Sequence, residues 1–360
     1  MSNAAAVRLS VVMAVRNGSA YLRDAVESVL AQAVTDFEFL IVDDASEDDT
    51  PEILFDYQRG DSRVRVLRND RNMGPYPSAN RGLVQARGRF IARHDADDIS
   101  PPERFAIQLA ALESDARVSL VTGAVEVFGD GRYANGISRP PSWQPRLEWE
   151  LLFTNVIGAG GQVMFPRVVQ GTPVLFPANR RYAEDYGLWC RLSRLGRVVC
   201  PEQVIYRYRQ HPSSITSLDK SQQDDCFATL RCEYQTRHVR SEVPPEITTD
   251  VSRFWNLDGG EALRIRFHRA IPIFTELRAN FLAYVGQRYG PSDRATLEAD
   301  LDRAGDLTDR LGYWLFRSIR FADANSCREI LAIAGARQEV TAVTGKALRR
   351  AARAILRRVR

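Results

Sequence analysis

Short apolar runs alternate with helix-like patterns along the first hundred residues of the chain. Each run is rich in β-branched and aromatic residues, and between the runs apolar residues recur at helical spacing. We expect strands at 9–15, 37–42, 64–67 and 90–92, with helices at about 21–30, 46–59 and 78–87. Strands that alternate with helices predict a mostly parallel sheet with helices on its faces.

The pattern is less regular after residue 100 and then changes to almost pure helix. We expect helices at about 101–114, 147–153 and 186–195, β-rich segments at 118–128, 162–165, 198–199 and 204–208, and a loop or short hairpin at 129–145. Beyond about residue 217 the pattern is helical, with breaks at 241–245 and 290–292. We therefore predict an α/β domain at 1–218 and an α-helical domain at 219–360.

Composition is that of an ordinary soluble globular protein. The 360 residues are 44% hydrophobic and 26% charged, enough for a sizeable core and for two domains. The five cysteines form no CxxC pair and no cluster with histidine, which favours a reducing, cytoplasmic compartment over a disulfide framework or a zinc site. We expect neither a signal peptide nor a membrane-spanning segment, because no run reaches the roughly 18 apolar residues that span a bilayer.

The positive charge lies in one segment. The formal net charge is +4, but residues 345–360 contain one Lys and six Arg and no acid, which leaves −3 on the rest of the chain. We therefore predict no nucleic-acid partner. Within 345–360 the apolar residues fall on one helical face and the basic residues on most of the remainder, as in helices that lie on anionic membranes. The alternative is a solvated helix packed on the helical domain.

Polar residues gather where three predicted strands end. The first strand leads into the loop Ala14, Val15, Arg16 and Asn17, the second into Asp43 and Asp44, and the fourth into Asp95, Asp97 and Asp98. In parallel α/β sheets ligands bind beyond the carboxyl ends of the strands, where loops from several crossovers meet. We expect these three loops to form one site.

The acidic residues of this edge suit a cation, with a structural alternative. Asp95 and Asp97 have the spacing of a carboxylate pair that binds Mg²⁺ or Mn²⁺ and leaves positions open for phosphate oxygens. They could instead cap a helix, since acids favour a helix start and prolines follow. We assign this capping role to Asp98. Asp44 can accept a hydrogen bond from a polar ligand, such as the imide of a base, or can cap the next helix.

Five motifs in order resemble the family 2 glycosyltransferases, which have the GT-A fold. They are Ser-Val-Val-Met-Ala-Val-Arg-Asn-Gly (10 to 18), Ala-Val-Glu-Ser-Val-Leu-Ala-Gln (25 to 32), Asp-Phe-Glu-Phe-Leu-Ile-Val-Asp-Asp-Ala-Ser (36 to 46), Ala-Arg-Gly-Arg-Phe-Ile-Ala-Arg-His-Asp-Ala-Asp-Asp (86 to 98) and Ala-Glu-Asp-Tyr-Gly-Leu-Trp (183 to 189). The resemblance covers residues 7 to about 216. It implies a GT-A domain, a Rossmann-like and mostly parallel sheet with flanking helices, followed by the helical extension.

The resemblance also implies an inverting transfer of a sugar from a nucleotide donor to an acceptor hydroxyl. At matching positions, Asp44 hydrogen-bonds the base and the loop 14–17 lines the same pocket. Asp95 and Asp97 match the DxD motif, whose second acid usually meets the metal that bridges the diphosphate. Asp97 is thus the first-choice ligand for Mn²⁺ or Mg²⁺, and Asp95 supports it.

Two further residues take roles from the same resemblance. Asp185 matches the catalytic base at the head of a helix, which takes the acceptor's proton as its oxygen attacks the anomeric carbon. Without the resemblance, Glu184 and Asp185 could merely cap that helix. His211 stands where similar enzymes often have His, close enough to approach the metal or a phosphate, although a lone loop His is as often structural.

The chain departs from the family's pattern in three places. Many relatives have Pro at the position of Ala14, and many have Arg where this chain has Ala79, so Arg81 and Arg93 become candidate cations for the diphosphate. Residues 158–161 are rich in Gly where polar residues are expected, and we expect them to serve close chain packing. Strand alternation should turn His94 away from Asp95, which leaves it outside the chemistry.

Together these features predict a metal-dependent glycosyltransferase that uses a UDP- or dTDP-sugar. We expect a glycan or lipid-linked acceptor in the synthesis of a cell-surface polysaccharide, with peripheral contact at the cytoplasmic face of the membrane through 345–360. Two alternatives stay open. A nucleotidyltransferase also pairs a parallel sheet with carboxylate-bound magnesium, but it normally has a denser Gly-rich phosphate loop than 14–18. The other alternative is a non-catalytic module that binds nucleotide sugars.

Overall fold

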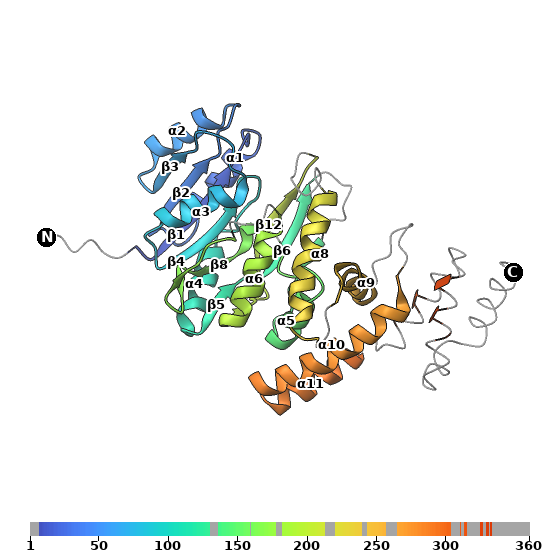
Figure 1. Cartoon of the computed structure of the whole chain (residues 1–360). Coiled ribbons are helices and arrows are strands. Elements are labelled where there is room, and N and C mark those ends of the chain that lie inside the picture. The colour runs from blue at the N-terminus through green and yellow to red at the C-terminus, as the bar shows by residue number, and fades with distance from the viewer. Residues whose placement is uncertain are drawn as a thin grey trace. The chain divides into compact units, whose positions relative to one another are not determined.

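A computed structural model of the chain describes residues 7–129, 136–158, 160–177, 182–212, 220–239, 243–256 and 265–303, with short pieces between 310 and 332. Its largest element is a seven-stranded sheet with strand order β11-β5-β8-β4-β1-β2-β3. The strands are β1 (Leu9–Val15), β2 (Glu38–Asp43), β3 (Val64–Arg68), β4 (Phe90–Asp95), β5 (Val118–Val121), β8 (Met164–Pro166) and β11 (Arg197–Val199). Figure 1 shows how they follow one another.

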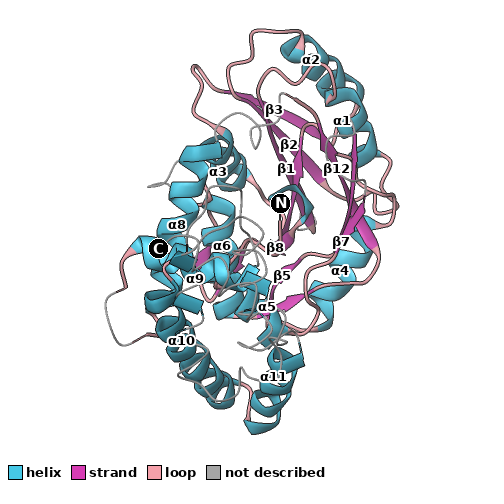
Figure 2. Cartoon of the chain, turned by 90° about the vertical axis from the view of Figure 1, so that its right-hand side faces the viewer, coloured by secondary structure: helices cyan, strands magenta, loops and turns pink. Residues whose placement is uncertain are grey.

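Six helices and two small sheets accompany the large sheet. The helices are α1 (Leu22–Leu30), α2 (Thr50–Gly60), α3 (Pro75–Gln85), α4 (Arg104–Ser114), α5 (Gln144–Leu151) and α6 (Glu184–Leu195). A second sheet joins β12 (Val204–Gln210), β6 (Ala124–Gly129) and β7 (Gly136–Ser138), and β9 (Val168–Val169) pairs with β10 (Thr172–Pro173). In Figure 2, α3 and α6 lie on one side of the large sheet and α1, α2 and α4 on the other.

Strand pairing brings the predicted site loops to one edge. β1 runs parallel to both β2 and β4, and β8 is antiparallel to its neighbours β4 and β5. Val15 pairs with Asp43 and Ala14 with Asp95, so the acidic ends of β2 and β4 flank the end of β1. The sheet is therefore mixed but mostly parallel, as predicted.

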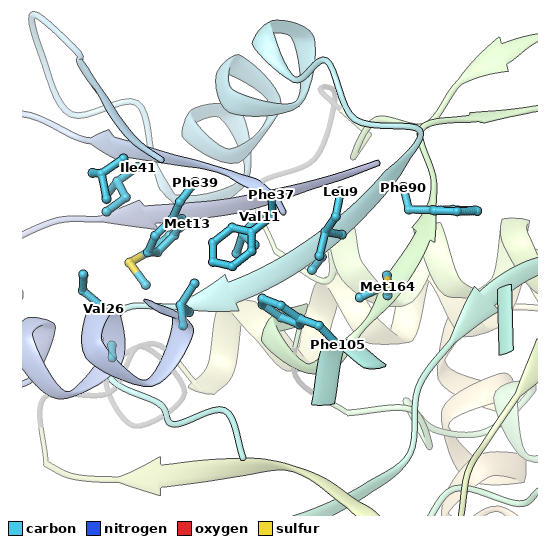
Figure 3. Packing of buried hydrophobic residues seen from close by; sticks show 14 of the residues in the cluster. Leu9, Val11, Met13, Val26, Phe37, Phe39, Ile41, Phe90, Phe105 and Met164 are labelled. Atoms are coloured by element: carbon cyan, nitrogen blue, oxygen red, sulfur yellow. The ribbon is translucent and has the colours of Figure 1, made fainter. Parts of the chain in front are cut away.

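The core of the large sheet follows the two-residue period of its strands. Alternate residues of β1, from Leu9 to Val15, pack with buried residues of α1, α2 and α4 in one apolar cluster (Figure 3). The intervening residues face α3, where a Cβ on Gly82 would lie 2.6 Å from Val12 and 3.3 Å from Val42. Burial on both faces explains why these strands are almost continuous apolar runs.

Some element boundaries differ from those expected. β4 runs through Asp95, so this carboxylate ends the strand rather than following it. The expected segment 118–128 divides at residues 122–123 into β5 and β6, which belong to different sheets. Where one strand is expected at 162–165, a 3-10 turn, η1 (Gly160–Gln162), precedes β8. At 129–145, where a loop or short hairpin is expected, the structure has the hairpin alternative, because β7 pairs antiparallel with β6.

The chain divides into two compact units, which we describe separately. One comprises Met1–Glu148 and Asn155–Cys226, and the other comprises Trp149–Thr154 and Phe227–Arg360. The helices of the C-terminal region are α8 (Lys220–Thr236), α9 (Pro245–Asn256), α10 (Phe267–Arg288) and α11 (Pro291–Arg303). Within the second unit, aromatic rings pack closely, with Trp255 stacked on Phe153 at 5.3 Å and on Phe274 at 5.8 Å. No described helix is long and apolar enough to cross a membrane.

Candidate active site

The loops after β1 and β2 are tied together by side chain to backbone hydrogen bonds. The Asn17 amide N–H donates to Ser46 Oγ at 3.0 Å, and the Glu47 amide donates to Asn17 Oδ1 at 2.9 Å. Asn17 is left-handed, with φ of 50°, a conformation that Asn tolerates better than most residues. These contacts fix the loop 14–17, in which Arg16 reaches outward to Glu47 at 3.3 Å. Contact of this loop with a nucleotide-sugar donor stays a prediction.

Asp44 lies beside this loop and is held from three directions. Its Oδ1 accepts hydrogen bonds from Asn69 Nδ2 at 2.7 Å and the Met73 amide at 2.8 Å, and Oδ2 accepts from the Gly74 amide at 2.8 Å. The side chain is 3% exposed. Asp44 therefore anchors the turn that begins α3, a task the sequence did not reveal, since Asn69 and residues 73–74 lie far from it along the chain.

Asp95 is enclosed by residues of its own strand, of η1 and of β12. Arg93 Nη2 lies 3.2 Å from its Oδ1, and its own amide donates to the Tyr206 hydroxyl at 3.0 Å. The Gly161 amide also donates to Asp95, and a Cβ on Gly161 would lie 2.6 Å from Asp95 Oδ2. Close packing is thus the role of this glycine. Burial and the nearby Asp97 carboxylate raise the pKa of Asp95, against the lowering effect of Arg93.

Asp97 and His211 meet at the rim of the site. His211 Nε2 lies 3.0 Å from Asp97 Oδ2, although the two residues are far apart along the chain. The Asp97 side chain is 35% exposed, which leaves it open to a ligand. Among the residues that the structure describes, no group of three His, Cys, Asp or Glu side chains is arranged to hold a metal ion. Asp97 and His211 supply oxygen and nitrogen donors of the kind that Mn²⁺ accepts, and Asp95 approaches from β4.

Asp98 does not cap a helix, contrary to our prediction. α4 begins at Arg104, its N-cap is Glu103, and no side chain caps it. Asp98 Oδ1 instead accepts a hydrogen bond from the Arg209 amide at 2.7 Å, and Arg209 Nε donates to the Asp97 carbonyl at 2.8 Å. Residues 97–98 are therefore fastened to β12, whose approach could not be foreseen from the local sequence.

The candidate diphosphate cations are already engaged. Arg93 is 2% exposed and donates to the Val12 carbonyl at 2.6 Å, besides its pair with Asp95. Arg81 donates to the Arg68 carbonyl at 2.6 Å, near Asn69 rather than near the DxD motif. Burial holds the pKa of His94 well below its usual value, and this residue is fully buried. None of these side chains projects freely from the edge.

Arg104 is a structural residue of the site that the sequence analysis missed. It is fully buried, and its Nη2 donates to the carbonyls of Arg93 and Gly161, each at 2.7 Å. Its guanidinium lies 4.8 Å from the centre of the Tyr206 ring. Because burial is the largest effect, the pKa of Arg104 falls to about 10. Arg104 joins β4, η1 and β12 behind Asp95.

Asp185 lies in the first turn of α6, where helix dipoles favour a negative charge. Burial outweighs that effect, and together with the Asp95 carboxylate it raises the pKa of Asp185 to about 6. Burial likewise raises the pKa of Glu184 to about 7, and the buried Glu184 Oε2 has no hydrogen-bond partner among the described residues. A carboxylate that titrates close to neutral pH is suited to take up a proton.

Two residues beside Asp185 also escaped the sequence analysis. Asn155 Nδ2 donates to Asp185 Oδ2 at 3.2 Å, and the Tyr76 hydroxyl donates to the same carboxylate. The carboxylates of Asp185, Asp95 and Glu184 all act on this tyrosine. The candidate base and the first acid of the DxD motif therefore both lie close enough to Tyr76 to raise the pKa of this residue.

Backbone strain gathers at the same edge. Among the described residues, four non-glycine residues have positive φ, namely Asn17, Ala45, Gln170 and Ala183. Asn17 and Ala45 follow β1 and β2, and Ala183 directly precedes α6 and its two acids. Left-handed backbone at non-glycine residues costs roughly 1–3 kcal/mol and is concentrated at functional sites in proteins.

Comparison with known proteins shows the family to which the chain belongs. The profile described as glycosyl transferase family 2 matches residues 10–169. The chain is 35% identical over 207 residues to a protein of Bacillus subtilis named putative glycosyltransferase EpsE, a match that covers 56% of this chain and 73% of that protein. It is 29% identical over 210 residues to the B. subtilis putative teichuronic acid biosynthesis glycosyltransferase TuaG, with 58% and 81% covered.

The fold is shared with a solved structure. The crystal structure of S. aureus TarS 1-349 matches with a TM-score of 0.55 and 16% identity, covering 92% of each chain.

A glycosyltransferase of Haemophilus influenzae is 26% identical over 239 residues, with 64% of this chain and 74% of that protein covered. The chain therefore belongs to glycosyl transferase family 2 and is a glycosyltransferase with a GT-A fold.

Proposed function

We propose that this glycosyltransferase is a metal-dependent, inverting enzyme that moves a sugar from a UDP- or dTDP-sugar to an acceptor hydroxyl. The observation that carries the proposal is the arrangement around Tyr76. Asp185 and Asp95 are distant in sequence, yet both carboxylates act on this tyrosine and raise its pKa. An inverting transfer needs a base and a diphosphate-binding group on opposite sides of one anomeric carbon.

Asp185 is the proposed base. Its carboxylate takes the proton of the acceptor hydroxyl while the acceptor oxygen forms a bond to the anomeric carbon. The bond from that carbon to the diphosphate oxygen breaks at the same time, and the nucleoside diphosphate leaves with the bonding electrons. A pKa raised to about 6 by burial leaves Asp185 ionised at neutral pH yet more basic than an ordinary aspartate.

The donor diphosphate is proposed to lie beside Asp97 and His211, at the rim of the site. A bound Mn²⁺ or Mg²⁺ would neutralise charge on the diphosphate. Asp97 and His211, 3.0 Å apart, would hold it, with Asp95 in support. The nucleotide base of the donor is proposed to lie beside Asp44 and the loop 14–17. Asp44 Oδ2 has only one hydrogen-bond partner among the described residues and keeps a free lone pair for an imide N–H.

We propose a cell-surface polysaccharide or a related glycan as the product. TuaG is named for teichuronic acid biosynthesis, which supports an acceptor of this class. Residues 345–360, for which we propose contact with the cytoplasmic face of a membrane, lie outside the described residues. The helical region 219–360 is proposed as a separate domain of the chain.

Release of nucleoside diphosphate from a panel of UDP-, dTDP- and GDP-sugars, with and without Mn²⁺, tests the proposal. UDP-GlcNAc is the first donor to try, because TarS has been crystallised with it. We expect Mn²⁺-dependent release of UDP or dTDP. Asp97→Asn should remove the Mn²⁺-dependent part, and Asp56→Asn, at an exposed position of α2, should leave it unchanged. Release of pyrophosphate would contradict the proposal, as would binding of UDP and Mn²⁺ without turnover of any donor.

A further inference from the structure

We propose that Asn155 and Tyr76 are positioning residues that hold the Asp185 carboxylate in its working orientation from two sides. The inference rests on the proposed role of Asp185 as the base. The two residues come from different segments, the loop after α5 and the first turn of α3. Neither belongs to a motif that the sequence analysis singled out.

The side-chain amide of Asn155 is held by the backbone of Gly158 as well as bonded to Asp185. Its Oδ1 accepts a hydrogen bond from the Gly158 amide at 3.1 Å, and its Nδ2 donates to the Gly158 carbonyl at 3.1 Å. The remaining hydrogen of Nδ2 is directed to Asp185 Oδ2 at 3.2 Å. Gly158 has φ of 87°, a conformation that glycine adopts readily, and this allows the reciprocal pair to form. The amide is thus pre-oriented toward the carboxylate.

Tyr76 is held by packing rather than by a backbone pair. Its ring lies 4.8 Å from that of Phe176, and Phe176 is fixed by two hydrogen bonds with the Asn80 side chain, at 2.8 and 2.9 Å. A Cβ on Gly160 would lie 3.7 Å from the Tyr76 hydroxyl, an ordinary van der Waals distance, so η1 lies close to this side chain as well. Burial raises the pKa of Tyr76 well above its usual value, so the hydroxyl stays a donor at neutral pH.

Two donors are needed here because the other charges around Asp185 oppose it. The groups that face it are Glu184 from its own helix, Asp95 from β4, and the donors Tyr76 and Asn155. Arg93, a cation that acts on Tyr76, is paired with Asp95. The Tyr186 amide of its own helix also donates to Asp185 Oδ1, at 2.7 Å. Without Asn155 and Tyr76 the carboxylate would lose stabilisation of its charged form and would be held by this helix amide alone, with Oδ2 free to turn.

Three variants and one control test the inference. Asn155→Asp keeps an acceptor for the Gly158 amide but removes the donor, Asn155→Ala removes both, and Tyr76→Phe keeps the ring. The control is Gln144→Ala. Gln144 donates to the Ser193 and Gly196 carbonyls at the opposite end of α6, at 3.0 and 2.9 Å, and does not touch Asp185.

We expect each of the three variants to lower kcat at pH 7 about 10-fold to 100-fold, with KM for the nucleotide sugar little changed. The acidic limb of the pH profile should move up by about one pH unit, because removal of a donor disfavours the carboxylate. The shift should be largest in Asn155→Asp, because the new carboxylate also adds a like charge beside Asp185. An NMR titration of the Asp185 carboxyl carbon needs no donor sugar and should show the same upward shift. Gln144→Ala should change neither quantity.

Two outcomes separate this inference from the proposed function. If Asp185→Asn abolishes turnover while the three variants match Gln144→Ala in kcat and in the NMR titration, the positioning role is wrong and the base assignment stands. If Asp185→Asn keeps near-normal turnover, the base assignment is wrong and the inference is lost with it.

Discussion

Asp44 and Asp185 are both buried carboxylates at one edge of the same sheet, yet their surroundings differ. Asp44 is 3% exposed and accepts short hydrogen bonds, of 2.7 to 2.8 Å, from two backbone amides and one side-chain amide. Asp185 is 9% exposed and accepts one short hydrogen bond, from the Tyr186 amide at 2.7 Å, while its bond from Asn155 is longer, at 3.2 Å. Glu184 and Asp95, both acids, lie close to it.

The same residue type therefore stabilises a turn at one position of this fold and is placed for reaction at another. A carboxylate whose oxygens are met by fixed donors stabilises its charged form and the turn around it. A carboxylate buried beside other acids is less stable as an ion and accepts a proton more readily. We therefore expect Asp44 to stabilise the fold and to bind the nucleotide-sugar donor, and we expect Asp185 to take part in the reaction.

The largest expected effect is on turnover. Asp185→Asn should lower kcat about 10²-fold to 10⁴-fold, the usual contribution of a general base, because the amide cannot take the acceptor's proton. Steady-state release of nucleoside diphosphate measures this, and calorimetric binding of UDP should show an affinity close to that of the wild type. Near-normal turnover in Asp185→Asn would remove the distinction between the two carboxylates.

A smaller effect is expected from pH. Because the base must be ionised, activity should fall below about pH 6, approaching tenfold per pH unit, as Asp185 takes up a proton. Glu184 titrates nearby, with a pKa of about 7, so the profile belongs to the pair. Glu184→Gln removes one like charge and should move the limb downward. A profile that stays flat from pH 5 to 8 would show that neither acid governs turnover.

Much of the fold could be predicted because the central strands are buried on both faces. Such strands are continuous apolar runs, and β1 occupies Leu9–Val15 as expected. The loops after β1, β2 and β4 meet at one edge because parallel strands present their carboxyl ends together. The roles of Asp95 and Asp185 come from the resemblance to the family motifs and stay predictions, and the carboxylates of both residues act on Tyr76.

The supporting contacts could not be predicted, since they join segments distant in sequence. Arg104 looked like an ordinary helix residue, yet it binds carbonyls of β4 and η1. Asp98 had the sequence context of a helix cap, yet β12 supplies its partner, the Arg209 amide. Hydrophobic periodicity carries no information about which loop approaches a given polar side chain.

The most direct test of the contrast between Asp44 and Asp185 is the free energy of unfolding of Asp44→Asn and Asp185→Asn at pH 7 and pH 4. Asp44→Asn should lose about 2–4 kcal/mol at pH 7, because one amide oxygen cannot satisfy three fixed donors. The pKa of Asp185 is raised from 3.8 to about 6 on folding, so ionisation costs stability above pH 6 and nothing below about pH 4.

Asp185→Asn should therefore be more stable than the wild type at pH 7, by up to about 3 kcal/mol, with the gain lost near pH 4. Chemical denaturation at both pH values gives these differences. Opposite signs for the two variants at pH 7 are the result that we predict. If Asp185→Asn destabilises the protein at pH 7 as Asp44→Asn does, both carboxylates are anchors and the account is wrong.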